Sequence, residues 1–176
     1  MKIIGITMGD PAGVGPEISV KALAANEEYR NQTIIFGSVK IIQYYLELLK
    51  IQILINVIDE PEDFKPGCIN VLNVMDVSFD DLQIGVQSPI AGDAAYQYIE
   101  RAIRLAMEGR IGPIVTAPLN KAALHDAGHV FDGHTEIFAT LTNTSQYTMM
   151  LWSERMSVVH ASTHVSLEEA CRRVTK

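Results

Sequence analysis

The chain has 176 residues, of which 48% are hydrophobic and 20% charged, and its formal net charge is −7. This composition excludes an intrinsically disordered chain, because disorder needs low hydrophobicity together with high charge. The acidic balance disfavours a nucleic acid or an anionic membrane as a partner, since both present phosphates of the same sign. A pocket with the opposite local charge can still bind a small anionic substrate.

The two cysteines, Cys68 and Cys171, are far apart in the sequence and form no C-x-x-C pair. A disulfide scaffold and a thiolate zinc finger are therefore excluded. No apolar run approaches the ~20 residues that span a bilayer, and the N-terminus lacks the layout of a signal peptide. These observations favour a cytoplasmic protein.

Short apolar runs alternate along the chain with segments of helical periodicity. The pattern predicts, in chain order, a strand at 3–8, a helix at 16–28, a strand at 33–36, a helix at 39–49, strands at 53–58 and 69–74, a helix at 93–108, a strand at 114–117, helices at 119–127 and 135–142, strands at 147–152 and 157–161, and a helix from Ser166. Gly109 suits a left-handed cap, and Ser166 and Glu169 have capping-box spacing. The alternation indicates an α/β protein with a mainly parallel sheet.

Two glycine- or proline-containing loops join a predicted strand to a predicted helix. The first, at residues 8–17, has the spacing G-x-x-x-G-x-G, which is neither the dinucleotide fingerprint nor a P-loop. Asp10 lies in it, at the strand end where ligands of open α/β sheets gather. The second, at 116–121, places Lys121 in a first helical turn, where a cation is unfavourable unless it meets an anion. The alternatives are a tight connection for the first loop and a solvated lysine for the second.

Histidines mark two further candidate sites. His134 and Thr135, at a predicted helix start, offer donors to a phosphate or carboxylate oxygen, although Thr135 can also be a simple N-cap. His160 and His164 belong to a strand and the following loop, so they are about 13 Å apart and cannot share one ion. His164 alone is the better ligand candidate, and its alternative is a structural histidine. All four motifs are predicted at strand-to-helix junctions, which share one edge of a parallel sheet.

Together, the segments 6–17, 116–121, 133–136 and 162–164 resemble the 4-hydroxythreonine-4-phosphate dehydrogenase family of vitamin B6 synthesis, which includes D-threonate and D-erythronate 4-phosphate dehydrogenases. The resemblance implies homodimers with two α/β/α domains per subunit and the active site at the interface. Residues 1–130 would form most of the first domain, and 131–176 the start of the second. The implied reaction is an oxidation followed by decarboxylation of a phosphorylated hydroxy acid, which needs NAD or NADP and a divalent metal (Zn, Mg or Co).

The resemblance also assigns roles to residues. His134 and Thr135 would bind the phosphorylated substrate, His164 would be one of three metal-binding histidines, and Asp10 and Lys121 would serve catalysis near the pocket. Cofactor-binding residues are not assigned. Family chains are about twice as long, which implies that this chain is an N-terminal part that binds neither metal nor NAD tightly alone. Two alternatives are a phosphate-acyltransferase-like relative without NAD or metal, which the His164 loop disfavours, and a non-catalytic truncated remnant.

Overall fold

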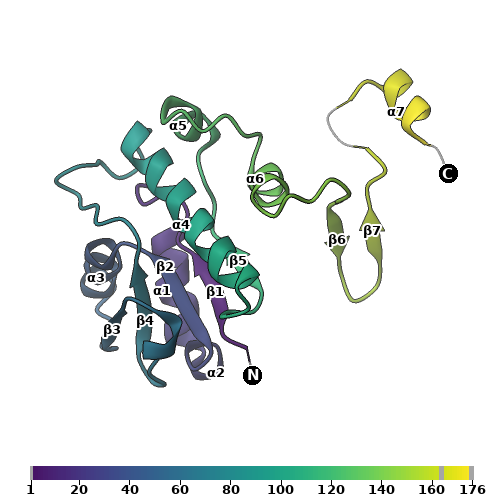
Figure 1. Cartoon of the computed structure of the whole chain (residues 1–176). Coiled ribbons are helices and arrows are strands. Elements are labelled where there is room, and N and C mark those ends of the chain that lie inside the picture. The colour runs from purple at the N-terminus through teal and green to yellow at the C-terminus, as the bar shows by residue number, and fades with distance from the viewer. Residues whose placement is uncertain (1, 163–164, 175–176) are drawn as a thin grey trace. The chain divides into compact units, whose positions relative to one another are not determined.

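The computed structural model describes residues 2–162 and 165–174 of the chain (Figure 1). The chain forms two compact units, Met1–Thr142 and Asn143–Lys176. No helix within the described residues is long and apolar enough to cross a membrane.

The first unit is built on a five-stranded sheet in which every pairing is parallel. Its strand order is β3-β4-β2-β1-β5. The strands are β1 (Ile4–Thr7), β2 (Thr33–Gly37), β3 (Ile55–Ile58), β4 (Ile69–Asn73) and β5 (Ile114–Thr116). The predicted mainly parallel α/β fold is therefore confirmed, and all five predicted strands of this unit are present.

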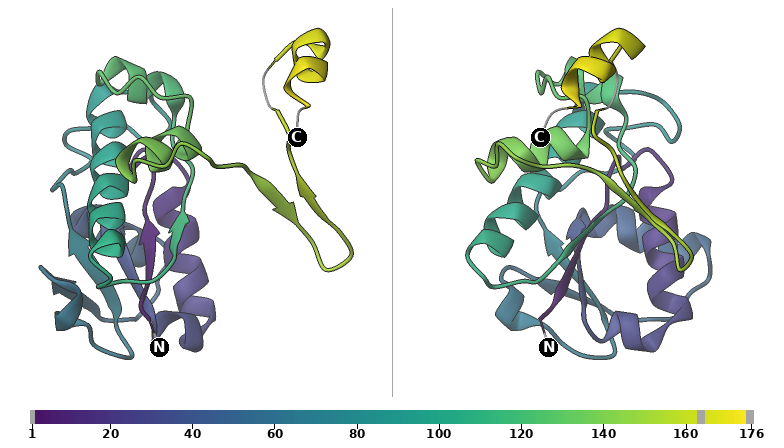
Figure 2. Two further views of the ribbon diagram at one scale, coloured as in Figure 1. Left: turned by 45° about the vertical axis from the view of Figure 1, so that its right-hand side comes forward. Right: turned by 90° about the vertical axis from the view of Figure 1, so that its right-hand side faces the viewer.

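Helices cover both faces of the sheet, as an α/β/α sandwich requires (Figures 1 and 2). On one face lie α1 (Gly15–Ala25) and α3 (Val39–Leu48), and on the other lies α4 (Pro89–Met107), against which α5 (Lys121–Asp126) and α6 (His134–Leu141) pack. The short helices α2 (Glu27–Arg30) and η1 (Pro61–Asp63) lie in connections. Right-handed crossovers between parallel strands impose this layering.

Two helix boundaries differ from the prediction because capping side chains decide them. The helix predicted at 16–28 divides at Asn26, whose side-chain oxygen accepts a hydrogen bond from the Tyr29 N–H at 3.0 Å and so starts α2. The helix predicted at 93–108 begins four residues earlier, at Pro89. Ser88 caps it by accepting from the Ala91 N–H at 3.2 Å, and proline suits a first helical position.

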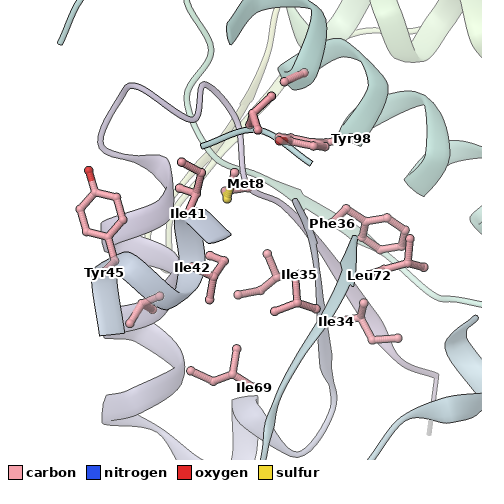
Figure 3. Packing of buried hydrophobic residues seen from close by; sticks show 14 of the residues in the cluster. Met8, Ile34, Ile35, Phe36, Ile41, Ile42, Tyr45, Ile69, Leu72 and Tyr98 are labelled. Atoms are coloured by element: carbon pink, nitrogen blue, oxygen red, sulfur yellow. The ribbon is translucent and has the colours of Figure 1, made fainter. Parts of the chain in front are cut away.

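The hydrophobic core lies on both faces of the central strand β2. Figure 3 shows Ile35 with Ile41 and Ile42 of α3 on one face, and Phe36 on the other face of the strand. All four side chains are fully buried. Burial of one such side chain contributes about 1.5–3 kcal/mol, so β2 anchors the sheet and fixes the ends of its neighbours.

The second unit contains an antiparallel hairpin, as predicted, with β6 (Met150–Trp152) paired to β7 (Ser157–Val159), followed by α7 (Leu167–Arg173). The Ser166 hydroxyl caps α7 by accepting from the Glu169 N–H at 3.3 Å. None of the residues in these three elements is buried. The expected domain boundary at residue 130 stays a prediction, because the division at Thr142 concerns compactness within this chain alone.

Candidate functional site

Two glycines of the first motif are required by close backbone contacts. A Cβ atom on Gly9, which has φ +72°, would lie 2.3 Å from the carbonyl oxygen of Pro118. A Cβ on Gly15 would lie 2.1 Å from the Met8 carbonyl oxygen. The loop after β1 therefore packs directly on the loop after β5, which agrees with the alternative that the glycines serve a tight strand-to-helix connection.

Asp10 lies almost wholly buried between these two loops, with an exposed fraction of 8%. Its carboxylate Oδ1 accepts a hydrogen bond from the Ala12 N–H at 2.8 Å, and its own N–H donates to the Pro118 carbonyl at 3.0 Å. Burial raises the pKa of the Asp10 carboxyl above its ordinary value, while hydrogen bonds from the Ala12 and Gly13 backbone oppose the rise. The group is thus a partly destabilised carboxylate at the carboxyl edge of the sheet.

A cavity of about 410 Å³ opens beside Asp10. It is lined by residues of the loops at 10–14, 85–87 and 118–120. The connections that follow β1 and β5 leave the sheet in different directions, and such a switch point is where open α/β sheets bind ligands. A larger groove of about 710 Å³ lies between α3 and β3, and Asp10, Lys121, His134 and Thr135 are not among its lining residues.

Lys121 is the first residue of α5, as predicted, with Asn120 as the N-cap. The Asn120 side chain accepts a hydrogen bond from the Ala123 N–H at 3.1 Å. The Lys121 side chain is exposed, and its ammonium group forms no hydrogen bond or ion pair with the described residues. An unpaired cation at the positive end of a helix is unfavourable unless an anion binds there.

His134 is the first residue of α6, and Gly133 takes the N-cap position without a side-chain hydrogen bond. The interpretation of Thr135 as an N-cap is therefore wrong, because Thr135 is an exposed residue of the first turn. The Nε2 atom of His134 is buried without a hydrogen-bond partner. Burial lowers the pKa of His134 below its ordinary value, against a smaller rise from a hydrogen bond with the Ala117 backbone, so the neutral imidazole is favoured at pH 7.

The second and third motifs lie next to each other. A Cβ atom on Gly133 would lie 3.8 Å from the Lys121 Cε and equally 3.8 Å from the Glu136 Oε2. The third motif is not at a strand-to-helix junction, which corrects the expectation, since it follows α5 through the loop at 127–133. It reaches the same edge because α5 is short and the loop returns to the backbone after β5.

The fourth motif can be placed only in part. His164 lies outside the described residues, so its distance from His160 and its role as a metal ligand stay predictions. Within residues 2–162 and 165–174, no group of three or more His, Cys, Asp or Glu side chains is arranged to hold a metal ion. The described residues therefore do not supply a metal site.

The loop at 85–87 lines the cavity but was not expected from the sequence. The Gly85 N–H donates to the Ala12 carbonyl at 2.8 Å, and the Gln87 side chain donates to Asp126 Oδ2 at 2.6 Å. The signal available was weak: a polar stretch follows β4, whose carboxyl end lies on the same edge as that of β1.

Comparison with known proteins places the chain in a family. The model of the family described as "Pyridoxal phosphate biosynthetic protein PdxA" matches residues 29–176. A D-threonate 4-phosphate dehydrogenase of Pectobacterium atrosepticum is 44% identical over 174 residues, which cover 96% of this chain and 52% of the relative.

Solved structures give the same result. The chain is similar to a 4-hydroxythreonine-4-phosphate dehydrogenase of Klebsiella pneumoniae, with a TM-score of 0.87 and 41% identity over 96% of this chain and 52% of that one. A 4-hydroxythreonine-4-phosphate dehydrogenase of Burkholderia phymatum gives a TM-score of 0.86 and 41% identity, covering 98% and 53%. The chain thus spans about half the length of the curated relatives that it matches. On the family match over residues 29–176, the chain belongs to the PdxA family of pyridoxal phosphate biosynthetic proteins.

Proposed function

We propose that this chain supplies the phosphate-anchoring half of a dehydrogenase that oxidises a 4-phosphorylated hydroxy acid. The proposed substrates are D-threonate 4-phosphate, D-erythronate 4-phosphate and 4-hydroxythreonine 4-phosphate. The names of the relatives support dehydrogenase chemistry over the acyltransferase alternative. The observation that carries the proposal is the juxtaposition of Lys121 with the start of α6 at Gly133 and His134.

Two kinds of donor meet at this point. The Lys121 ammonium has no partner among the described residues, and the first N–H groups of α6 are free of a side-chain cap. The unpartnered Nε2 of His134 donates only when the imidazole is protonated, because the other ring nitrogen donates to the Ala117 backbone in the neutral form, and a bound phosphate dianion would favour that protonation. A helix N-terminus and a nearby cation together favour a phosphate dianion. Thr135, exposed in the first turn, adds a hydroxyl donor.

Anchoring of the phosphate would serve catalysis by orientation. Binding energy from a group remote from the reacting carbon can hold the carbinol in one position, which lowers the entropic part of the barrier. The cavity beside Asp10 would then receive the rest of the ligand, and the buried Asp10 carboxylate would hold the loop that shapes it. A catalytic role of Lys121 or Asp10 in moving a proton is part of this proposal.

The proposal includes NAD or NADP as the acceptor of the hydride and loss of CO2 from the β-keto acid that the oxidation forms. It also includes a divalent metal (Zn, Mg or Co), to which His164 would contribute one ligand. The described residues alone supply no set of ligands for this ion. A homodimer with a shared active site and a cytoplasmic location complete the proposal.

The experiment that tests the anchor compares two ligands that differ only in the phosphate. The 176-residue protein is titrated with D-threonate 4-phosphate and with D-threonate, and binding is followed by the amide NMR signals of residues 133–136. We expect these signals to shift on addition of D-threonate 4-phosphate. The affinity for D-threonate should be at least tenfold weaker. Equal affinity for both ligands, or shifts only elsewhere in the protein, would contradict the proposal.

A further inference from the structure

Asp93, Tyr96 and His129 form a small array that joins α4 to the loop between α5 and α6. The His129 Nε2 lies 2.8 Å from Asp93 Oδ1, and the imidazole stacks on the Tyr96 ring with centroids 3.8 Å apart and planes 13° apart. The other carboxylate oxygen, Asp93 Oδ2, accepts a hydrogen bond from Gln97 at 2.7 Å. Both oxygens of Asp93 are therefore engaged within the protein.

The array continues along the loop toward the start of α6. The Phe131 ring lies nearly parallel to that of Tyr96, with centroids 5.9 Å and planes 12° apart. The Phe131 carbonyl lies 2.8 Å from the His125 Nε2, and the His129 N–H donates to the Leu124 carbonyl at 3.1 Å. The loop at 128–133 is thus held by α4 and by α5 at once.

The start of α6 needs such support from outside. Its N-cap, Gly133, has no side chain to cap the helix, so the first turn is closed by the backbone hydrogen bond from the Ile137 N–H to the Gly133 carbonyl at 3.2 Å. Ile137, one turn further on, is fully buried beside Ile99 and Leu124, but before it the start of α6 meets the rest of the chain through the hydrogen bond between His134 and the Ala117 backbone and the approach of Gly133 to Lys121. Fixation of the preceding loop therefore favours these contacts.

We propose that Asp93, Tyr96 and His129 are positioning residues. They hold the loop at 128–133 in place, and so keep His134 hydrogen-bonded to the Ala117 backbone, next to Lys121. None of the three has to touch a ligand for this role. The purpose of the arrangement, to preorganise the phosphate anchor, rests on the proposed function, whereas the placement of His134 does not. A site held by such supporting contacts loses affinity when its members gain freedom.

The test follows the titration of the His134 imidazole by NMR in two variants. D93A removes the Asp93 carboxylate at a helical position, where alanine is well tolerated. H129F keeps an aromatic ring stacked on Tyr96 but lacks the two nitrogen atoms of the imidazole. The His134 signal is identified by its loss in H134Q. D76A is the matched control, because Asp76 is likewise a partly exposed carboxylate with one basic side-chain partner, the Lys40 ammonium at 2.8 Å.

In the wild type, the midpoint of the His134 titration should lie below the ordinary histidine pKa, because the imidazole is buried. In D93A and H129F this midpoint should rise toward about 6.5, because the imidazole becomes exposed to solvent. D76A should leave it unchanged. A purely structural role would lower Tm without moving this midpoint, which is measured far below Tm. An unchanged midpoint in a folded D93A or H129F would overturn the proposal, and if D93A fails to fold, H129F decides alone.

A second titration separates this inference from the proposed function. Inorganic phosphate is added to each protein while the Thr135 amide signal is followed. A phosphate-dependent shift that weakens several-fold in D93A and H129F, but not in D76A, supports both. If the wild type shows no shift, the proposed anchor fails, whereas the comparison of His134 midpoints still confirms or overturns the positioning role.

Discussion

The backbone N–H of Asp10 donates a hydrogen bond to the carbonyl oxygen of Pro118 at 3.0 Å, and so joins the loops that follow the neighbouring strands β1 and β5. Asp10 and Pro118 are far apart in the sequence. They meet here because β4 connects to β5 across the sheet through α4, which places β5 beside β1. This bond defines one wall of the cavity and holds the Asp10 carboxylate at its rim.

Replacement of Gly9 by alanine should destabilise the protein strongly. The added Cβ would lie 2.3 Å from the Pro118 carbonyl oxygen, at a residue with φ +72°. We expect the free energy of unfolding to fall by about 3 kcal/mol or more, from the positive φ and the overlap together. Urea denaturation of the purified variant measures this.

G109A is the control for the change at Gly9. Gly109 has a similar φ of +76°, but a Cβ there would meet no atom within 4 Å. Only the conformational strain remains, which costs about 1 kcal/mol. Equal losses of stability in the two variants would show that the contact between the β1 and β5 loops is unimportant.

Replacement of Asp10 by asparagine should make the protein more stable at neutral pH. Burial raises the folded-state pKa of Asp10, so the protonated form contributes stability that is present at low pH and lost as the pH rises through the folded-state pKa. The asparagine oxygen can still accept the Ala12 N–H, without a buried charge. Denaturation midpoints of D10N and wild type should therefore differ at pH 7 and converge toward pH 3.

A loss of stability in D10N at pH 7 would mean that the Asp10 charge has a favourable partner in the protein. A gain in stability accompanied by weaker ligand binding would instead fit a carboxylate kept for function at a cost in stability. The two results are read from the same protein preparations.

Removal of the Glu136 charge should strengthen phosphate binding. The Glu136 Oε2 lies as close to the Gly133 Cβ position as the Lys121 Cε does, 3.8 Å, so a phosphate bound there meets an unfavourable carboxylate. Interactions between charges near the protein surface are worth about 0.2–1 kcal/mol, so E136Q should bind inorganic phosphate up to about fivefold more tightly. Isothermal titration calorimetry at low salt would measure the change.

E28Q is the control for net charge, because Glu28 is an exposed residue of α2. If E136Q and E28Q change the affinity equally, the effect comes from the overall charge of −7 rather than from the position of Glu136.

Local patterns predicted most of the fold. The buried runs Ile34–Phe36 and Ile69–Leu72 are rich in β-branched residues and end at Gly37 and Asn73, which is why β2 and β4 could be predicted. The start of α4 was missed, although Ser88-Pro89 is a cap followed by a suitable first residue, because the apolar periodicity becomes clear only after Asp93. Such boundaries depend on single hydrogen bonds.

The candidate site was predictable in its members but not in its supports. Asp10, Lys121 and His134 stood out by their places at the ends of elements, and the structure brings their loops together at one edge. The pair Asp93 and His129 carries no local signal, since the two residues come from different elements, 36 positions apart. Contacts of that kind follow from tertiary packing, which a single sequence does not encode in any short pattern.

The most direct test of the phosphate anchor is the ratio of affinities for D-threonate 4-phosphate and D-threonate in K121M, which keeps the length of the side chain and removes its charge. We predict that K121M loses most of the preference for the phosphorylated ligand while its Tm stays within a few degrees of the wild type, because the ammonium group has no partner among the described residues. A K121M protein that binds the phosphorylated ligand with the wild-type preference would contradict the account.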